Sequence, residues 1–152
     1  MQWPRSGAWP VTSRATARHN RAMRKDEVAR GPRGRVIVVD SITQLDADDA
    51  GAIVVSGSHG GTSSAAFALE QPLRLVFFND AGGGKDAAGI AALALLQARG
   101  VAAATVAHGS ARIGDALDAW QHGVVSHVNA AARALGVGVG QSVAVAARAL
   151  LG

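Results

Sequence analysis

Two glycine-rich stretches carry residue types that suit a ligand site. The first reads Ser-Gly-Ser-His-Gly-Gly-Thr over residues 56–62, and the second reads Asn-Asp-Ala-Gly-Gly-Gly-Lys-Asp over residues 79–86. Glycine adopts positive φ readily, and backbone N–H groups before a helix bind phosphate, carboxylate or a developing oxyanion. We therefore predict that both stretches contact an anionic or amide-containing small molecule. The alternative is a pair of tight turns whose hydroxyl groups cap the following helices.

Proton transfer in such a site requires a general acid or base. His59 and Lys85 are the candidates, and Lys85 is the only lysine after residue 35. Asp80 or Asp40 would orient the base. Ser58 is a candidate nucleophile, although a serine needs a base within about 3 Å, and adjacent side chains need not point at each other. The alternative for Lys85 is a solvated amine that pairs with a neighbouring aspartate.

A further polar stretch, residues 108–115, adds Ser110 and Arg112. Arginine suits bidentate binding of a carboxylate or a phosphate, and an ion pair with Asp115 or Asp118 explains Arg112 equally well. The predicted catalytic residues are Ser58, His59, Asp80 and Lys85. The predicted substrate-binding residues are Asp40, Ser56, Gly57, Gly60, Gly61, Asn79, Gly82, Gly83, Gly84, Ser110 and Arg112.

Several kinds of chemistry are excluded or disfavoured. The chain has no cysteine, so thiolate ligands, disulfides and cysteine nucleophiles are impossible. The run Gly82–Lys85 fails as a nucleotide-binding P-loop, because Asp86 stands where a magnesium-binding Ser or Thr belongs and Asn79 replaces the first glycine. The histidines lack a metal-binding spacing. We expect neither a metal nor a cofactor.

The elements that position these residues follow from the apolar pattern. Apolar runs predict strands over residues 36–39, 52–55, 73–78 and 101–107. Helices are predicted over residues 65–70, 86–99, 113–122, 128–135 and 141–151. This alternation predicts a three-layer α/β sandwich with a mostly parallel sheet of four or five strands and flanking alanine-rich helices.

The two ends of the predicted strands differ in composition. The carboxyl ends run into the polar and glycine-rich stretches above, whereas the opposite ends carry ordinary turn residues such as Gly51, Pro72 and Gly100. Ligands of open parallel sheets bind at the carboxyl ends of the strands. This asymmetry therefore places the predicted site at that edge of the sheet.

Charge separates the chain into two parts. Residues 1–35 hold nine basic and two acidic residues, a net charge of +7, whereas residues 36–152 hold six basic and nine acidic residues, a net charge of −3. We therefore assign residues 1–34 to a basic arm and residues 35–152 to one domain. The arm is interpreted as an upstream extension with a natural start at Met23, the alternatives being a transit-like segment or a flexible tail that contacts nucleic acid. A nucleic-acid-binding domain would carry its own basic face, so nucleic acid is not expected to bind elsewhere.

Composition also sets expectations about partners and location. Only 4% of the residues are aromatic, so each residue buries modest area, and we expect a homo-oligomer. No apolar run approaches the about 20 residues that span a bilayer, and no signal peptide is visible. We expect a soluble cytoplasmic protein that does not bind membranes.

The order of a strand that ends in Ser-Gly-Ser-His-Gly and a strand that ends in Asn-Asp-Ala-Gly resembles the caspase-type α/β layout over residues 52–110. In that layout a cysteine ends the second strand, at a position that falls near Ala81 here. Because the chain has no cysteine, the resemblance supports the sheet layout and excludes that peptidase chemistry.

Two functions remain at this point. The first is a small-molecule hydrolase, lyase or isomerase that acts on an anionic or amide-containing metabolite held by the glycine-rich stretches. The second is a ligand-binding or partner-binding α/β subunit of a larger complex that does not catalyse a reaction.

Overall fold

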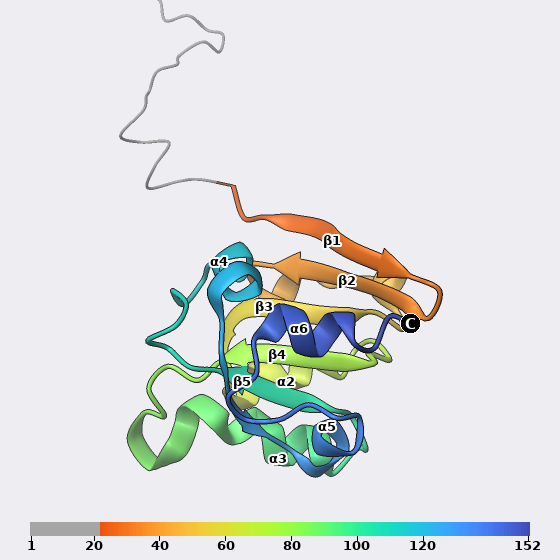
Figure 1. Ribbon diagram of the computed structural model, residues 1–152. Coiled ribbons are helices and arrows are strands. Elements are labelled where there is room, and N and C mark those ends of the chain that lie inside the picture. Colours follow the sequence, from red (N-terminus) through yellow and green to blue (C-terminus); the bar gives the residue numbers. More distant parts are fainter. Residues whose placement is uncertain (1–21) are drawn as a thin grey trace, which may run out of the picture.

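The computed structural model describes residues 22–152, which form an α/β fold around one six-stranded sheet (Figure 1). The strands are β1 (Lys25–Gly31), β2 (Gly34–Val39), β3 (Ile53–His59), β4 (Leu75–Asn79), β5 (Ala103–Val106) and β6 (Val125–Val128). They lie in the order of the sequence. The four central strands, β2 to β5, run parallel, and β1 and β6 are antiparallel strands at the two edges.

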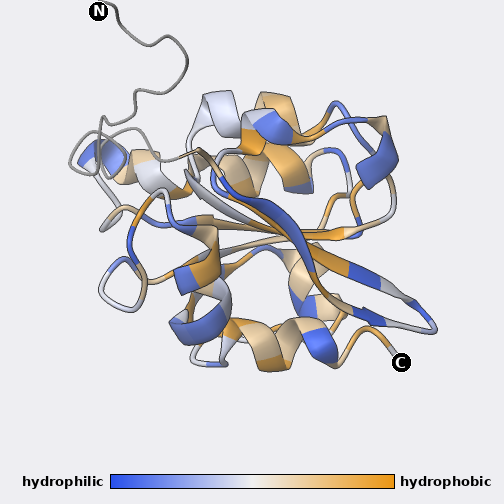
Figure 2. Cartoon of the chain, turned by 90° about the horizontal axis from the view of Figure 1, so that it is seen from above, coloured by the Kyte–Doolittle hydropathy of each residue, from blue (hydrophilic) through white to orange (hydrophobic). Residues whose placement is uncertain are grey.

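Helices cover both faces of this sheet, as the view from above shows (Figure 2). The α-helices are α2 (Thr62–Ala68), α3 (Ala91–Gln97), α4 (Ala116–His122), α5 (Ala130–Ala134) and α6 (Val143–Arg148). Three 3-10 helices are η1 (Ile42–Gln44), η2 (Ala47–Asp49) and η3 (Lys85–Ile90). The expected α/β fold with a mostly parallel sheet is confirmed, with six strands instead of the four or five predicted.

Two apolar cores lie on opposite faces of the sheet because neighbouring strand residues point to opposite sides. Val36 and Val38 belong to one core, while Ile37 and Val39 belong to the other. Helices α2 and α3 and the short η1 pack on the second core, and α4, α5 and α6 pack on the first. The connections between the parallel strands therefore share one face, and the chain after β5 covers the other.

The two edge strands were not predicted. Strand β1 lies in the segment that the sequence analysis assigned to the arm, and β6 precedes the helix predicted from residue 128. Edge strands keep polar residues toward solvent, so neither sequence, KDEVARG or VSHV, forms an apolar run. The other predictions on the arm concern residues 1–21, which lie outside the described residues.

Two boundaries near the predicted site also differ. Strand β3 continues to His59, so Ser56, Gly57 and Ser58 are strand residues and do not belong to a loop. The helix predicted over residues 86–99 becomes α3 only at Ala91, because Asp86 and Ala87 adopt left-handed backbone angles. Within residues 22–152, no helix combines the length and apolar composition that crossing a membrane requires.

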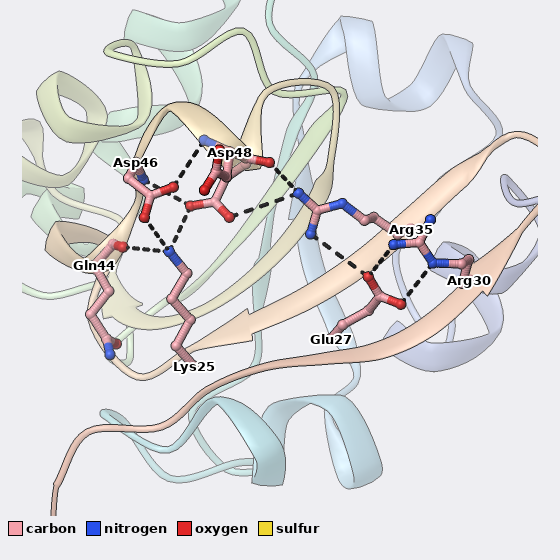
Figure 3. A network of polar contacts seen from close by, with 8 residues as sticks. Lys25, Glu27, Arg30, Arg35, Gln44, Asp46 and Asp48 are labelled. Carbon is pink, nitrogen blue, oxygen red and sulfur yellow. Dashed lines mark hydrogen bonds and ion pairs between the residues drawn. The ribbon is translucent and has the colours of Figure 1, made fainter.

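A polar network fastens β1 to the connection between β2 and β3 (Figure 3). The Lys25 Nζ donates hydrogen bonds to the Asp49 carboxylate at 2.9 Å, the Asp46 carboxylate at 3.2 Å and the Gln44 carbonyl at 2.9 Å. The Asp49 side chain is buried and also accepts the Asp46 N–H at 2.8 Å. The Asp49 carboxylate thus accepts a hydrogen bond from a lysine of β1 and also caps η2.

Replacing this carboxylate should therefore destabilise the protein. We expect Asp49→Ala to lower the free energy of unfolding by about 2–4 kcal/mol, because it removes the buried carboxylate partner of Lys25 and leaves the Asp46 N–H without its acceptor. Urea unfolding followed by circular dichroism measures the change. The matched control is Asp48→Ala, whose side chain is exposed and should cost less than about 0.5 kcal/mol. Equal losses for the two variants would contradict this role of Asp49.

Candidate functional site

The carboxyl ends of the four parallel strands meet at one edge of the sheet, at the left of Figure 1. At this edge the segments that follow β4 and β5 run to opposite faces of the sheet. The segment after β4 leads to α3 on one face, whereas the segment after β5 leads to α4 on the other. Such a divergence opens a crevice in parallel sheets. Asp80 follows β4 directly and His108 follows β5, so these two residues flank the divergence.

Asp80 and His108 form a hydrogen-bonded pair there. The Asp80 side chain is 8% exposed, and its Oδ1 lies 3.2 Å from the His108 Nδ1 and 3.0 Å from the His108 backbone N–H. The His108 side chain is 65% exposed. A buried carboxylate therefore fixes one ring nitrogen of a histidine whose other edge faces solvent.

The protonation state of Asp80 determines how this pair works. Burial raises the pKa of the Asp80 carboxyl, but hydrogen bonds from the Gly82 N–H, the Ser126 hydroxyl and His108 together lower the pKa below its ordinary value. Asp80 is thus ionised at neutral pH and can only accept hydrogen bonds. The His108 Nδ1 must then carry the proton, and Nε2 of the neutral ring presents its lone pair.

Hydroxyl groups support Asp80 from the side of β6. Ser126 donates to the Asp80 carboxylate, and its Oγ lies 2.9 Å from the Oγ1 of the buried Thr105. The Nδ1 of His127 lies 3.1 Å from each of these two hydroxyl oxygens. These contacts restrict the rotation of the Asp80 carboxylate.

A hollow of about 170 Å³ borders His108 and is lined by Gly109, Ser110, Ala111, Arg112 and Asp118. The Arg112 side chain is 80% exposed, and its guanidinium lies 3.7 Å from the Asp115 carboxylate and 3.8 Å from the Asp118 carboxylate. Arg112 thus forms the ion pairs with Asp115 and Asp118 that were the alternative for this residue, although the separations exceed hydrogen-bond distances and its guanidinium makes no hydrogen bond within residues 22–152. His108 and Arg112 therefore line the same hollow.

Three other residues that were predicted to bind substrate, Asp40, Asn79 and Gly57, make contacts within the fold at this edge of the sheet. Asp40 Oδ2 accepts the Arg24 N–H at 2.7 Å and Asp40 Oδ1 accepts the Ala116 N–H at 2.9 Å. Asn79 Nδ2 donates to the Ala111 carbonyl at 3.1 Å. Gly57 lies against the Asp40 carbonyl and the Gly114–Asp115 backbone, where a Cβ would come within 2.8 Å. These residues join the loops to the strands.

The hydroxyl groups of three predicted residues are also used within the fold. Ser56 Oγ accepts the Ser58 N–H at 2.9 Å, and Ser58 Oγ accepts the Ile42 N–H at 3.0 Å. Ser110 Oγ donates to the Ala107 carbonyl at 2.7 Å. Ser58 is thus held by a backbone group, and no base from residues 22–152 lies within hydrogen-bonding distance of its hydroxyl.

Four of the six glycines expected to bind an anion donate their N–H groups to acceptors within the fold. Gly60 donates to the Asn79 carbonyl at 3.0 Å, and Gly61 donates to the His59 carbonyl at 2.9 Å. Gly82 and Gly83 donate to the Asp80 side chain and carbonyl at 2.8 and 2.7 Å. Gly84 and Lys85 have N–H groups without a hydrogen bond from residues 22–152. The second glycine-rich stretch therefore wraps Asp80.

His59 and Lys85 are not brought to Asp80. Both side chains are exposed and neither has a hydrogen bond or ion pair within residues 22–152. The ring of His59 lies against Gly61. Asp80, which was expected to orient one of them, orients His108 instead. The sequence analysis did not assign His108, although its place directly after a predicted strand follows the same rule that identified Asp80.

No group of three or more His, Asp or Glu side chains within residues 22–152 is arranged to hold a metal ion. Among the protein-family models, the curated proteins and the solved structures compared with this chain, none matches it. A proposal about function therefore rests on the residues and geometry of this chain.

The packing of the Asp80 loop can be tested at Gly89. A Cβ on Gly89 would lie 2.0 Å from the Asp80 carbonyl oxygen, so Gly89→Ala should displace this loop and lower the free energy of unfolding by about 1–3 kcal/mol. Thermal or urea unfolding measures the loss. Gly109→Ala is the matched control, because nothing lies within 4 Å of a Cβ there. If Gly89→Ala were as stable as Gly109→Ala, the close contact would be refuted.

The ionised Asp80 also predicts a dependence on pH. Because its pKa is lowered in the folded protein, its stabilisation is present above the unfolded-state pKa of about 3.9 and disappears as the pH falls through the folded-state pKa. Asp80→Asn should therefore be less stable than the natural protein by about 1–2 kcal/mol at pH 7. This difference should narrow below about pH 4. Urea unfolding at pH 7 and pH 3 compares the two, and a difference that grows in acid would contradict the lowered pKa.

Proposed function

We propose that this protein is a small-molecule enzyme, a hydrolase, lyase or isomerase, that acts on an anionic or amide-containing metabolite. One observation carries the proposal: a buried, ionised carboxylate orients an exposed histidine at the rim of a hollow that an arginine also lines. Buried carboxylates that fix a histidine tautomer are a common arrangement for general acid–base catalysis.

In this proposal His108 Nε2 removes a proton from the substrate or from a water molecule. The positive charge that develops on the ring is stabilised by Asp80, which stays ionised. Arg112, whose ion pairs with Asp115 and Asp118 are longer than hydrogen bonds, binds the anionic group of the substrate through its guanidinium donors. His108 then returns the proton to the leaving group or to the product carbon.

The roles first assigned to His59 and Lys85 are kept as the competing version of the same proposal. Both are exposed at the same edge of the sheet, and no residue of the described part of the chain, 22–152, forms a hydrogen bond or ion pair that would orient them. Their N–H and side-chain donors suit contact with the substrate better than proton transfer from a fixed position. The two versions differ in which variant loses turnover.

The test starts from a substrate panel of esters, cyclic amides, phosphate monoesters and hydroxy acids. A ligand at about 100 times its dissociation constant should stabilise the fold by about 2.7 kcal/mol, which identifies the class to assay. On that substrate we expect His108→Ala to lower kcat by about 10²–10⁴-fold. Asp80→Asn should lower kcat as well, since the wrong ring tautomer is then favoured.

His59→Ala and Lys85→Ala are the matched controls, since each removes an exposed titratable side chain from the same edge. Both should keep kcat within about 3-fold, an expectation from their lack of an orienting partner. Full turnover in His108→Ala together with loss in His59→Ala or Lys85→Ala would reject the assignment to His108 and favour the competing version.

Binding without turnover is the second candidate function. The observation that favours it is that the hydroxyl groups of Ser56, Ser58 and Ser110 all make hydrogen bonds to backbone groups, and none of the three has a hydrogen-bonded base among residues 22–152. In that case the thermal shift would identify a ligand that the natural protein leaves chemically unchanged, and the protein would serve as a binding subunit, alone or as a homo-oligomer.

A further inference from the structure

A second hollow of about 300 Å³ adjoins the one at His108. Arg112 and Asp118 line both hollows, and the second one extends to Arg24, which precedes β1, and to Gln121 and His122 on α4. It therefore continues the site across the surface of α4, away from the predicted reacting group.

The acidic side chains in this hollow are engaged by the protein. Asp118 accepts the Arg112 N–H at 2.9 Å and lies 2.8 Å from the His122 Nδ1. The hydrogen bond from the Arg112 N–H and then that from His122 lower the pKa of Asp118. Asp115 caps α4 by accepting the Asp118 N–H at 3.0 Å. Both carboxylates thus position the loop and the helix.

Unused hydrogen-bond donors in this hollow belong to Arg24, Arg112 and Gln121. Arg24 uses one guanidinium nitrogen on Asp26 at 2.7 Å, and its remaining donors make no side-chain hydrogen bond within residues 22–152. The Arg112 guanidinium is ion-paired with Asp115 at 3.7 Å and with Asp118 at 3.8 Å, beyond hydrogen-bond distance, and the Gln121 amide has no hydrogen bond in the same part of the chain. Two guanidinium groups and an amide that line one hollow suit an oxyanion.

We propose that this hollow is a subsite for an oxyanion, a phosphate or carboxylate group, that lies at the far end of the substrate from the reacting atoms. The inference rests on the proposed function for the position of the reacting group and extends it by naming the substrate class. The substrate is an elongated metabolite whose anionic end binds between Arg24 and Arg112, while its reacting end lies at His108.

The test uses inorganic phosphate and succinate as separate probes at constant ionic strength. Two-dimensional NMR of the whole chain follows the Gln121 side-chain amide and the backbone N–H groups of α4 during titration. We expect saturable shifts there with at least one of the two probes, and the stronger probe tells phosphate from carboxylate. Arg24→Gln and Arg112→Gln should each weaken that binding by about 10-fold or more, the loss of one charge-assisted pair.

Arg30→Gln is the matched control. Arg30 is an exposed arginine of the same strand segment, paired with Glu27 at 2.7 Å as Arg24 is with Asp26, and it lines neither hollow. It should change the affinity less than about 2-fold, because surface pairs contribute little. Equal weakening by Arg30→Gln, or unchanged binding in both Arg24→Gln and Arg112→Gln, would overturn the subsite. Circular dichroism of each variant separates lost binding from lost folding.

His108→Ala separates this inference from the proposed function. Oxyanion binding at Arg24 and Arg112 should be unchanged in His108→Ala, because His108 does not line this hollow. If His108→Ala kept full turnover while Arg24→Gln weakened binding, the proposed reaction would fail and the subsite would stand. If the probes bound nowhere near α4 while His108→Ala lost turnover, the subsite would fail and the proposed reaction would stand.

Discussion

The candidate site depends on the hydrogen bonds that the Asp80 carboxylate accepts. It sits where the chain leaves β4 toward one face of the sheet, next to the point where the chain leaves β5 toward the other. Its oxygens accept hydrogen bonds from its own loop, from His108 and from Ser126. A buried charge needs this many donors, since an unpaired carboxylate in the interior costs several kcal/mol. One aspartate therefore joins three segments and holds the ring of His108.

The glycines in the loop after β4 allow the backbone to make these contacts with Asp80. Gly82 and Gly83 turn the chain at positive φ so that their N–H groups reach Asp80, and Gly89 lets the loop pass against the Asp80 carbonyl. Three residues other than glycine, Ala81, Asp86 and Ala87, also adopt left-handed angles in this loop. Such angles cost about 1 kcal/mol or more each and persist where surrounding contacts fix them. The oxyanion contacts that we propose lie instead at the arginines of the neighbouring hollows.

The sequence predicted the central strands because residues buried on both faces leave a continuous apolar run, such as Val36–Val39. It missed β1 and β6 because an edge strand shows polar residues on its outer side, and it misplaced the start of α3 because propensity does not reveal the left-handed turn at Asp86. It also indicated the edge of the sheet at which polar residues gather. It named Asp80 and Arg112 there, yet paired Asp80 with His59 or Lys85.

What the sequence determined by itself is local: which segments are buried strands, which ends of those strands are polar, and that cysteine chemistry is absent. Only the tertiary structure decided which polar groups meet. The hydrogen bonds that Asp80 accepts from His108 and from Ser126 join residues that are 28 and 46 positions apart along the chain. That pairing depends on strand order and on the face to which each connection runs, since these set the distances between loops. Composition and periodicity contain neither quantity, because both describe neighbours along the chain and not across the sheet.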